Sequence, residues 1–331
     1  MPPTARAKVL PRKKPSKTEW ASVELHKESS AAKSMPVDTL HDGVDSSQVM
    51  VRSGRFRGSF LMATNGGSTF EEILRSQLTE SRSRARHQGS QEKPLPDDRS
   101  PKKRLNLQNV IGADERQLIP DTTRIPVRSI GLLRILPEDG ILRYGTAWLI
   151  GPQTLATAAH NLLHPQAGKT QRMDFALAYD GQNAHGGWHR VVAGKLSDGW
   201  NKSAEPGSPL DFAVLRLEHS LGNQTGWLGF ADYEDAKFAN MAVNLFGYPL
   251  DLEGYAMYGA RGRVLAINEG RVFYDCDAGG GMSGGPVLAV FGEQRIAVGI
   301  HVAGGSTSNA ATRISGPAYD LLERYRIWPN E

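Results

Sequence analysis

The sequence predicts an all-β fold that follows a basic N-terminal tail without a core of its own. From about residue 124 onward, short runs rich in Val, Ile, Leu and aromatic residues alternate with Gly, Pro, Asp and Asn, as strands and turns do. Long helical patterns are missing between these runs, which argues against a parallel α/β sheet. Residues 1–110 hold 20 Lys and Arg against 12 Asp and Glu, whereas residues 111–331 hold 19 against 23. The change of charge marks a boundary near residue 110.

The segment 1–109 has the composition of a disordered tail or pro-segment. Stretches such as "SRSRARHQGSQEKPLPDDRSPKKR" combine low hydrophobicity with no periodicity, so they bury too little apolar surface to offset their ordering entropy. A short helix is expected near residues 69–80, because Ser68 and Glu71 form a capping box ahead of apolar residues at helical spacing. The chain start lacks the apolar run of a signal peptide, so no conventional secretion signal is visible.

The body from residue 110 to 331 is predicted to form one domain built from many short strands. Strands are expected within residues 129–136, 144–151, 154–159, 211–218, 241–249, 262–268, 271–277, 285–292 and 295–305, and a helix within 316–328. So many strands in about 200 residues indicate barrels or a sandwich. The single cysteine, Cys276, excludes an internal disulfide.

Several function classes find no support in the sequence. No stretch approaches the ~18 consecutive apolar residues of a membrane span, so no membrane partner is expected. The pattern "HNLLH" places Asn161 where a zinc protease needs glutamate, so neither a metal site nor another cofactor is predicted. "HGGWH" at residues 185–189 is too rich in glycine for a helix and is read as a surface loop. Nucleic acid is not an expected partner, because the basic tail lacks interleaved aromatic residues.

Three residues in the body are candidates for nucleophilic catalysis. Ser283 lies in the glycine-rich stretch "DAGGGMSGGPV", where glycine allows backbone angles that other residues avoid. His160 ends the small-residue run "TLATAAH" where the chain turns, and Asp211 precedes the apolar strand "FAVLRL". The order histidine, aspartate, serine is that of the chymotrypsin-like double barrel. Together they predict a triad of nucleophile, general base and orienting carboxylate.

The same segments resemble the glutamyl endopeptidase family of chymotrypsin-like serine proteases. "GTAWLIGPQTLATAAHNL", "DFAVLRL" and "YDCDAGGGMSGGPV" are similar to the family's histidine, aspartate and serine segments, and "VGIHVAGG" to the strand that follows the serine. The resemblance implies two six-stranded antiparallel β-barrels, a C-terminal helix and a serine endopeptidase that acts on polypeptides. It also implies an oxyanion hole formed by the N–H groups of Gly281 and Ser283.

The resemblance further implies how substrate is recognised. His301 stands where the family has a histidine at the base of a pocket for glutamate, with Gly304 just beyond it. Ala278 stands where the family usually has Thr or Ser, which removes one hydroxyl donor. "VIGADERQLIPDTT" from Val110 is similar to the start of the family's mature enzymes. The resemblance implies that an activating protease cleaves before Val110 and that the new α-ammonium group faces the substrate carboxylate. It also implies secretion, although no signal peptide is visible.

Two alternatives stay open from the residues alone. Asp277 lies six residues before Ser283, where trypsin-like enzymes carry a carboxylate for Arg or Lys, so a basic preference is the first alternative. The second is a catalytically silent protease-like binding module, which the presence of all three triad residues disfavours.

Overall fold

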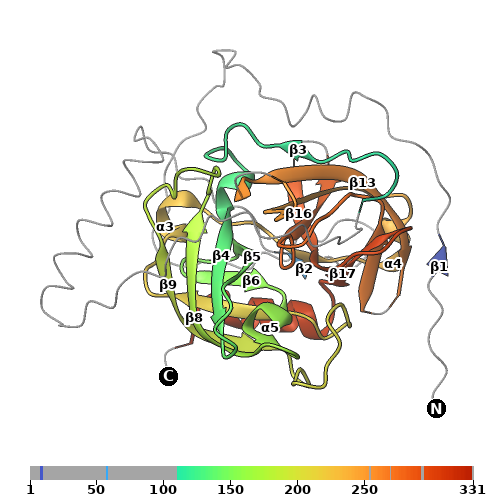
Figure 1. Cartoon of the computed structure of the whole chain (residues 1–331). Helices are drawn as coiled ribbons and strands as arrows, with labels where there is room; N and C mark the ends of the chain where they lie inside the picture. Colours follow the sequence, from blue (N-terminus) through green and yellow to red (C-terminus); the bar gives the residue numbers. More distant parts are fainter. Residues whose placement is uncertain are drawn as a thin grey trace, which may run out of the picture.

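The computed structural model confirms the all-β fold and shows two closed antiparallel barrels. It describes residues 8–9, 57–58, 110–252, 255–268, 270–291 and 294–329. In Figure 1 the N-terminal barrel is green to yellow and the C-terminal barrel orange to red, and the two lie side by side. The helix expected near residues 69–80 lies outside the described residues.

Each barrel is a ring of six strands. The N-terminal ring runs β4-β5-β6-β10-β9-β8 and closes through β4–β8 pairing. The C-terminal ring runs β13-β12-β15-β16-β17-β14 and closes through β13–β14 pairing. The ring strands are β4 (Ile130–Pro137), β5 (Arg143–Leu149), β6 (Thr154–Thr157), β8 (Gly168–Leu177), β9 (His189–Leu196), β10 (Ala213–Leu217), β12 (Ala242–Gly247), β13 (Tyr258–Ile267), β14 (Arg271–Tyr274), β15 (Pro286–Phe291), β16 (Gln294–Ala303) and β17 (Asn309–Arg313).

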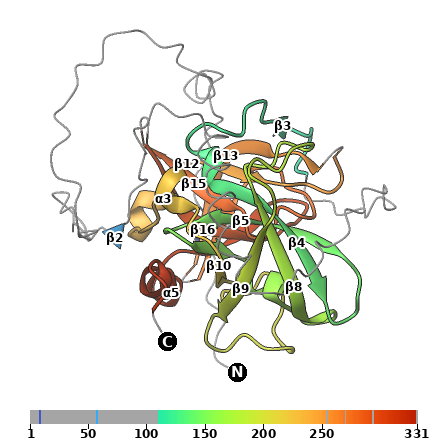
Figure 2. The same ribbon diagram turned by 90° about the vertical axis from the view of Figure 1, so that its left-hand side faces the viewer.

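Short elements lie outside the rings. They are β1 (Lys8–Val9), β2 (Arg57–Gly58), β3 (Gln117–Leu118), β7 (Leu163–His164), β11 (Ala231–Asp232), the 3-10 helix η2 (Val127–Ser129), and the helices α2 (Ala159–Leu162), α3 (Gly222–Thr225), α4 (Asp235–Phe238) and α5 (Pro317–Tyr325). Although α5 follows the C-terminal barrel in sequence, it packs beside β10 of the N-terminal barrel, and Figures 1 and 2 both show it there. The hydroxyl of Thr154 in β6 donates to the Tyr325 carbonyl at 2.8 Å, which ties this helix to that barrel.

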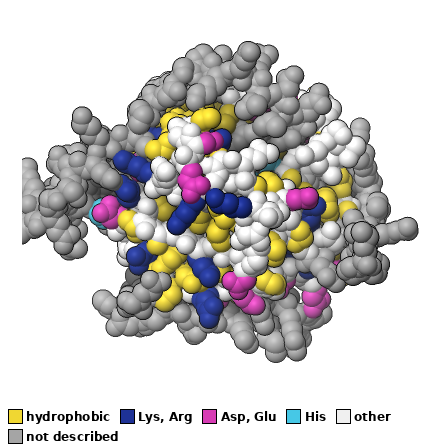
Figure 3. Space-filling model, turned by 60° about the horizontal axis from the view of Figure 1, so that its bottom comes forward, with side chains coloured by type: hydrophobic (Ala, Val, Ile, Leu, Met, Phe, Trp, Pro, Cys, Tyr) yellow, Lys and Arg dark blue, Asp and Glu magenta, His cyan; other side chains and the backbone are white. Residues whose placement is uncertain are grey.

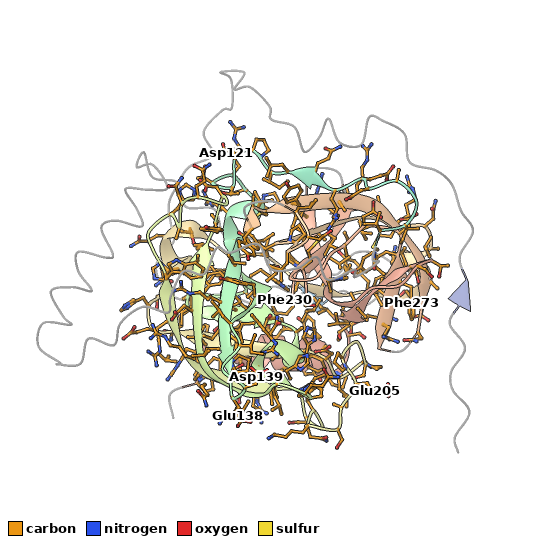
Figure 4. All side chains as sticks on the ribbon, in the orientation of Figure 1. Asp121, Glu138, Asp139, Glu205, Phe230 and Phe273 are labelled. Carbon is orange, nitrogen blue, oxygen red and sulfur yellow. The ribbon has the colours of Figure 1, made fainter. Side chains whose placement is uncertain are left out.

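Both faces of several strands are buried, which explains their nearly continuous apolar sequence. In β4, Leu133 and Ile135 belong to the core inside the N-terminal barrel. Ile130 and Leu132, on the opposite face, belong to a larger core that also receives residues from the C-terminal barrel and from α5. Phe230, labelled in Figure 4, lies in this shared core between the barrels. Successive strand residues point to opposite faces, so each face supplies one core.

The described surface carries mixed charge. On the face shown in Figure 3, Lys and Arg side chains are interspersed with Asp, Glu and apolar residues. Among the described residues, no helix has both the length and the apolar character needed to cross a bilayer.

Candidate active site

His160 and Asp211 form a hydrogen-bonded pair at the edge of the N-terminal barrel. His160 lies in α2, directly after β6, and its Nδ1 is 2.7 Å from Asp211 Oδ2. The backbone N–H of His160 donates to Asp211 Oδ1 at 3.0 Å. The Asp211 side chain is fully buried, whereas 12% of the His160 side chain is exposed. A carboxylate on Nδ1 fixes the tautomer with the proton on that nitrogen and leaves Nε2 as the proton acceptor.

Asp211 is held by contacts from both barrels, through its carboxylate on one side and its backbone carbonyl on the other. The Gly207 N–H donates to Asp211 Oδ2 at 2.7 Å, so three N–H groups satisfy this buried acid. The hydroxyl of Thr312, in β17 of the C-terminal barrel, donates to the Asp211 carbonyl at 3.2 Å. Asp211 therefore lies where the two barrels meet.

Ser283 lies in the loop between β14 and β15, which we call the nucleophile loop (residues 277–285). Two tight turns shape it: the Met282 N–H donates to the Gly279 carbonyl at 3.1 Å, and the Gly285 N–H to the Met282 carbonyl at 2.9 Å. Gly281 has φ +93° and Gly284 φ +90°, angles that favour glycine. Asn161, the residue after His160, donates from Nδ2 to the Ser283 carbonyl at 3.1 Å. The structure thus brings the serine beside the helix that carries His160.

Two backbone N–H groups of this loop, those of Gly281 and Ser283, point away from the neighbouring hydrogen bonds of the loop. The Gly280 carbonyl accepts from the Leu250 N–H at 2.7 Å. The carbonyl and N–H of a trans peptide point in opposite directions, so the Gly281 N–H points away from Leu250, and the Ser283 N–H likewise points away from the Gly285 N–H. Within the described residues neither N–H donates to any acceptor. Both remain available to a negatively charged oxygen.

His301 is buried next to the nucleophile loop. Its backbone N–H donates to the Gly285 carbonyl at 2.8 Å, and its carbonyl accepts from the Gly284 N–H at 2.7 Å. Its side chain is buried, with Nδ1 2.6 Å from the Tyr274 hydroxyl. Burial, together with the nearby His160, lowers the pKa of His301 to about 3, although the Asp211 charge and the Ala310 backbone raise it in part. His301 is therefore neutral near pH 7.

The other predicted substrate contacts lie around this loop at different depths. Ala278 is fully buried in the core of the C-terminal barrel, whereas Gly304 is exposed just after β16. Val110 is half-buried at the start of a segment that reaches the loop. The Ile111 N–H donates to Asp277 Oδ1 at 2.7 Å.

The arrangement around Asp277 disfavours the trypsin-like alternative. Asp277 is 3% exposed, and its second oxygen, Oδ2, accepts from the Glu115 N–H at 2.7 Å. Both carboxylate oxygens are therefore engaged by residues 110–116, which we call the N-terminal segment. A carboxylate that must select Arg or Lys side chains has to face the substrate pocket. Asp277 instead joins the N-terminal segment to the nucleophile loop.

A buried arginine adds a second link between these two segments. The Arg116 guanidinium donates to Asp251 at 2.9 and 2.6 Å and to Asp114 at 3.0 and 2.7 Å. Burial alone would lower the pKa of Arg116, but the hydrogen bonds to the two carboxylates outweigh it and raise the pKa. A Cβ on Gly279 would overlap Arg116 and Asp251, so the loop backbone packs directly against this ion group.

Sequence reasoning missed three contributors to this site. Asn161 was considered only as the residue that breaks a zinc motif, yet its amide contacts the Ser283 carbonyl. Thr146 donates from its hydroxyl to the Gly281 carbonyl at 2.9 Å. Asp277 was considered only as a substrate contact. The available signal was a polar residue within an otherwise apolar or small-residue segment, which indicates a buried hydrogen bond.

Potential metal ligands are scattered. The described residues contain no group of three or more His, Cys, Asp or Glu side chains able to hold a metal ion. The two histidines of "HNLLH" are not on one helix, because α2 ends at Leu162 and His164 belongs to β7.

Comparisons with known proteins agree with the double-barrel fold. Residues 145–300 match the model of the trypsin-like peptidase domain. The chain is 27% identical over 232 residues to the glutamyl endopeptidase of Bacillus licheniformis, covering 67% of this chain and 70% of that protein. It is 26% identical over 229 residues to a Bacillus subtilis protein named extracellular metalloprotease, covering 69% of this chain and 72% of that protein.

Solved structures share the fold. A Glu endopeptidase bound to MPD matches with a TM-score of 0.56 and 21% identity, over 66% of this chain and 99% of that chain. The protease Anisep from Arthrobacter nicotinovorans matches with a TM-score of 0.51 and 18% identity, over 62% of this chain and 96% of that chain. The double barrel, the trypsin-like domain match and the similarity to the Bacillus licheniformis enzyme together support a glutamyl endopeptidase-like serine endopeptidase of the chymotrypsin fold, a class whose substrates are polypeptides.

Proposed function

We propose that the chain hydrolyses peptide bonds with a triad of His160, Asp211 and Ser283 and prefers Glu, or Asp, on the acyl side of the scissile bond. The observation that carries this proposal is the buried Asp211 carboxylate, 2.7 Å from His160 Nδ1, beside the loop that presents Ser283. This arrangement leaves His160 Nε2 as the only ring nitrogen able to accept a proton.

The reaction has two steps. Ser283 Oγ attacks the carbonyl carbon of the scissile bond while His160 Nε2 takes the serine proton. The C–N bond then breaks as the imidazolium returns this proton to the leaving amine, which leaves an acyl-enzyme. Water attacks the acyl-enzyme in the same way and releases the carboxylic acid and the free serine. Asp211 stabilises the imidazolium in both steps.

The Gly281 and Ser283 N–H groups are proposed to bind the oxyanion of each tetrahedral intermediate. Both lie in peptide groups whose orientation is fixed by hydrogen bonds on the opposite side. A donor fixed beforehand does not reorganise when negative charge develops, and removing one such donor costs roughly 100-fold or more in rate.

His301 is proposed to donate a hydrogen bond to the substrate carboxylate. Burial raises the pKa of Tyr274 well above its usual value, so the phenol stays protonated, and in the proposed tautomer it donates to His301 Nδ1. The ring proton is then on Nε2. A neutral N–H donor suits a carboxylate, and the α-ammonium group of Val110 would supply the positive charge. Ala278 offers no hydroxyl, so we expect a weaker Glu preference than in a site with Thr or Ser there.

Cleavage before Val110 is proposed to activate the protein. The Ile111 N–H already donates to Asp277, so a new α-ammonium group would form one residue from the nucleophile loop. The full chain has no ammonium group at this position and should therefore be less active. The bond to be cleaved follows Asn109, so the activating protease would be a separate enzyme with a different preference.

A cleavage profile on a peptide library tests these points, with protein that starts at Val110 beside the full chain. Ser283→Ala and His160→Ala should abolish activity in the short form, apart from residual catalysis, without unfolding it. His301→Ala should narrow the Glu-over-Gln preference by roughly 10- to 100-fold, because only the charged substrate loses a charge-assisted hydrogen bond, which is worth about 1.5–3 kcal/mol. His219→Ala, at a side chain that is 36% exposed, is the matched control.

The outcomes separate the alternatives. Activity of Ser283→Ala near the wild-type level would refute the triad. A folded, processed wild type that neither cleaves peptides nor reacts with a serine-directed probe would favour the binding module. Equal activity of the full chain and the short form would refute activation by cleavage.

A further inference from the structure

A buried hydrogen-bond chain joins the helix that carries His160 to the loop that carries Ser283. Asn161 is 6% exposed and follows His160 in α2. Its Nδ2 donates to the Thr157 hydroxyl at 3.0 Å and to the Ser283 carbonyl at 3.1 Å. The two N–H bonds of one amide therefore connect a strand of the N-terminal barrel to a loop of the C-terminal barrel. The Thr157 hydroxyl oxygen and the Ser283 carbonyl oxygen are the two acceptors.

The Ser283–Gly284 peptide group is fixed on both of its sides. Its carbonyl accepts from Asn161 and also from the Thr146 N–H at 2.9 Å. Its N–H, which belongs to Gly284, donates to the His301 carbonyl at 2.7 Å. Fixing this plane restrains the backbone at Ser283, and so the direction of the bond from Cα to the serine side chain.

The same chain fixes the Gly281 carbonyl. The Thr157 hydroxyl donates to the Thr146 carbonyl at 2.8 Å, and the Thr146 hydroxyl donates to the Gly281 carbonyl at 2.9 Å. Thr146 and Thr157 are fully buried, so water does not compete for these bonds. Thr146 thus holds the peptide group that follows the Gly281 N–H.

The packing around Asn161 leaves little room for another residue type. A Cβ built on Gly145 would be 2.7 Å from Asn161 Nδ2 and 2.8 Å from Oδ1, so the amide fills the space beside that glycine. The Thr157 hydroxyl proton is already donated to Thr146, so Thr157 Oγ1 can only accept. An aspartate at 161 would fill the same volume but set a carboxylate oxygen against two acceptors.

We propose that Asn161 is a positioning residue that couples the His160 helix to the nucleophile loop, with Thr146 holding the Gly281 side of the same loop. The proposal rests on the triad proposed above. Through these contacts, the general base and the nucleophile keep one relative orientation although they come from different barrels. A misplacement of about 1 Å in such a site can cost roughly 100-fold in rate.

The test compares Asn161→Asp with Asn183→Asp in protein that starts at Val110. Asn183 is exposed and donates from Nδ2 to Asp180 at 3.0 Å, so its variant makes the same chemical change away from this chain of bonds. Three quantities are measured: kcat and KM on one peptide substrate, the rate constant of inactivation by a small fluorophosphonate, and thermal unfolding.

Asn161→Asp should lower kcat and the inactivation rate constant by about 100-fold while KM changes less than about threefold, and Asn183→Asp should leave all three near wild type. A purely structural role would lower Tm and the folded fraction without changing the rate constant per folded molecule. If Asn161→Asp does not fold, Thr146→Val decides, since it keeps the side-chain shape and the backbone N–H but removes the hydroxyl bound to Gly281. It should lower kcat about 10-fold or more.

Wild-type inactivation by the fluorophosphonate in a folded Asn161→Asp protein would overturn the proposal. So would wild-type rates in Thr146→Val if Asn161→Asp does not fold. Ser283→Ala distinguishes this failure from a failure of the triad. If Ser283→Ala is inactive and Asn161→Asp is fully active, only the positioning role is refuted. If Ser283→Ala is active, the triad itself is refuted.

Discussion

Replacing Asp277 by asparagine should detach the N-terminal segment from the nucleophile loop. The carboxylate accepts from the Ile111 and Glu115 N–H groups, each at 2.7 Å, and is 3% exposed. Two hydrogen bonds to a charged acceptor are each worth about 1.5–3 kcal/mol, and the asparagine oxygen keeps one neutral bond of about 1 kcal/mol. The docking free energy should therefore fall by about 2–5 kcal/mol. We expect lower activity toward Glu substrates because the Val110 ammonium group loses its fixed place.

Amide hydrogen exchange in protein that starts at Val110 measures this effect directly. The Ile111 and Glu115 amides should exchange roughly 30- to 4,000-fold faster in Asp277→Asn, at about 1.4 kcal/mol per factor of ten. Asp180→Asn is the matched control, because Asp180 Oδ1 accepts from the Gln182 and Asn183 N–H groups at 2.8 and 2.6 Å in an exposed loop. Unchanged exchange at both amides would refute the reasoning. Cleavage after Arg or Lys that disappears in Asp277→Asn would instead restore the trypsin-like alternative.

Two further predictions concern stability. Burial, with a contribution from His219, lowers the pKa of His189 in the folded state to about 4. The pKa in the unfolded state is about 6.5, so as the pH drops below about 6.5 the unfolded state takes up the proton first. The free energy of unfolding therefore decreases as the pH is lowered from about 6.5 to about 4. Between pH 7 and pH 4.5 the free energy of unfolding should decrease by about 2–3 kcal/mol less in His189→Gln than in the wild type. Urea unfolding at each pH measures this difference, and the same pH profile in both proteins would contradict it. Gly284→Ala should abolish activity and lower the free energy of unfolding by several kcal/mol, because its Cβ would overlap Thr146 and Thr157. Gly187 is the control: it also has a positive φ, +91°, but a Cβ there would meet nothing within 4 Å, so Gly187→Ala should cost only about 1–2 kcal/mol. Equal unfolding midpoints of the two alanine variants would contradict the overlap.

The sequence predicted strands whose residues are mostly apolar and missed strands that are partly polar and owe their burial to neighbouring strands. The strand β4 reads as an apolar run because its two faces pack into two cores. By contrast, β17 has the sequence "NAATR" and is buried throughout, since β14 and β16 enclose it. The strand β8 begins with the largely polar "GKTQR" and becomes continuously buried only from Met173. The stretch 185–189, predicted as a loop, ends at His189, which begins β9.

The site was predictable where the chemistry is local and unpredictable where contacts are distant in sequence. His160, Asp211 and Ser283 were selected from their flanking residues, which set a strand end, a turn and a glycine-rich loop. The supporting contacts join residues far apart: 122 positions between Asn161 and Ser283, and 166 between Ile111 and Asp277. A single sequence carries no periodic signal for such pairs, because the fold alone decides which loops meet.

The two-barrel architecture explains why these supporting contacts are polar. The proposed general base and its carboxylate come from the N-terminal barrel, whereas the proposed nucleophile and oxyanion donors come from the C-terminal barrel. The shared apolar core holds the barrels together, but apolar contacts have no preferred direction. A small rotation of one barrel against the other therefore costs little free energy. Hydrogen bonds weaken steeply with angle, so the bonds from Asn161 to Ser283 and from Thr312 to Asp211 restrain orientation across the boundary. Substitutions in the apolar core should therefore act mainly on stability, and substitutions in these polar contacts mainly on the rate of acylation.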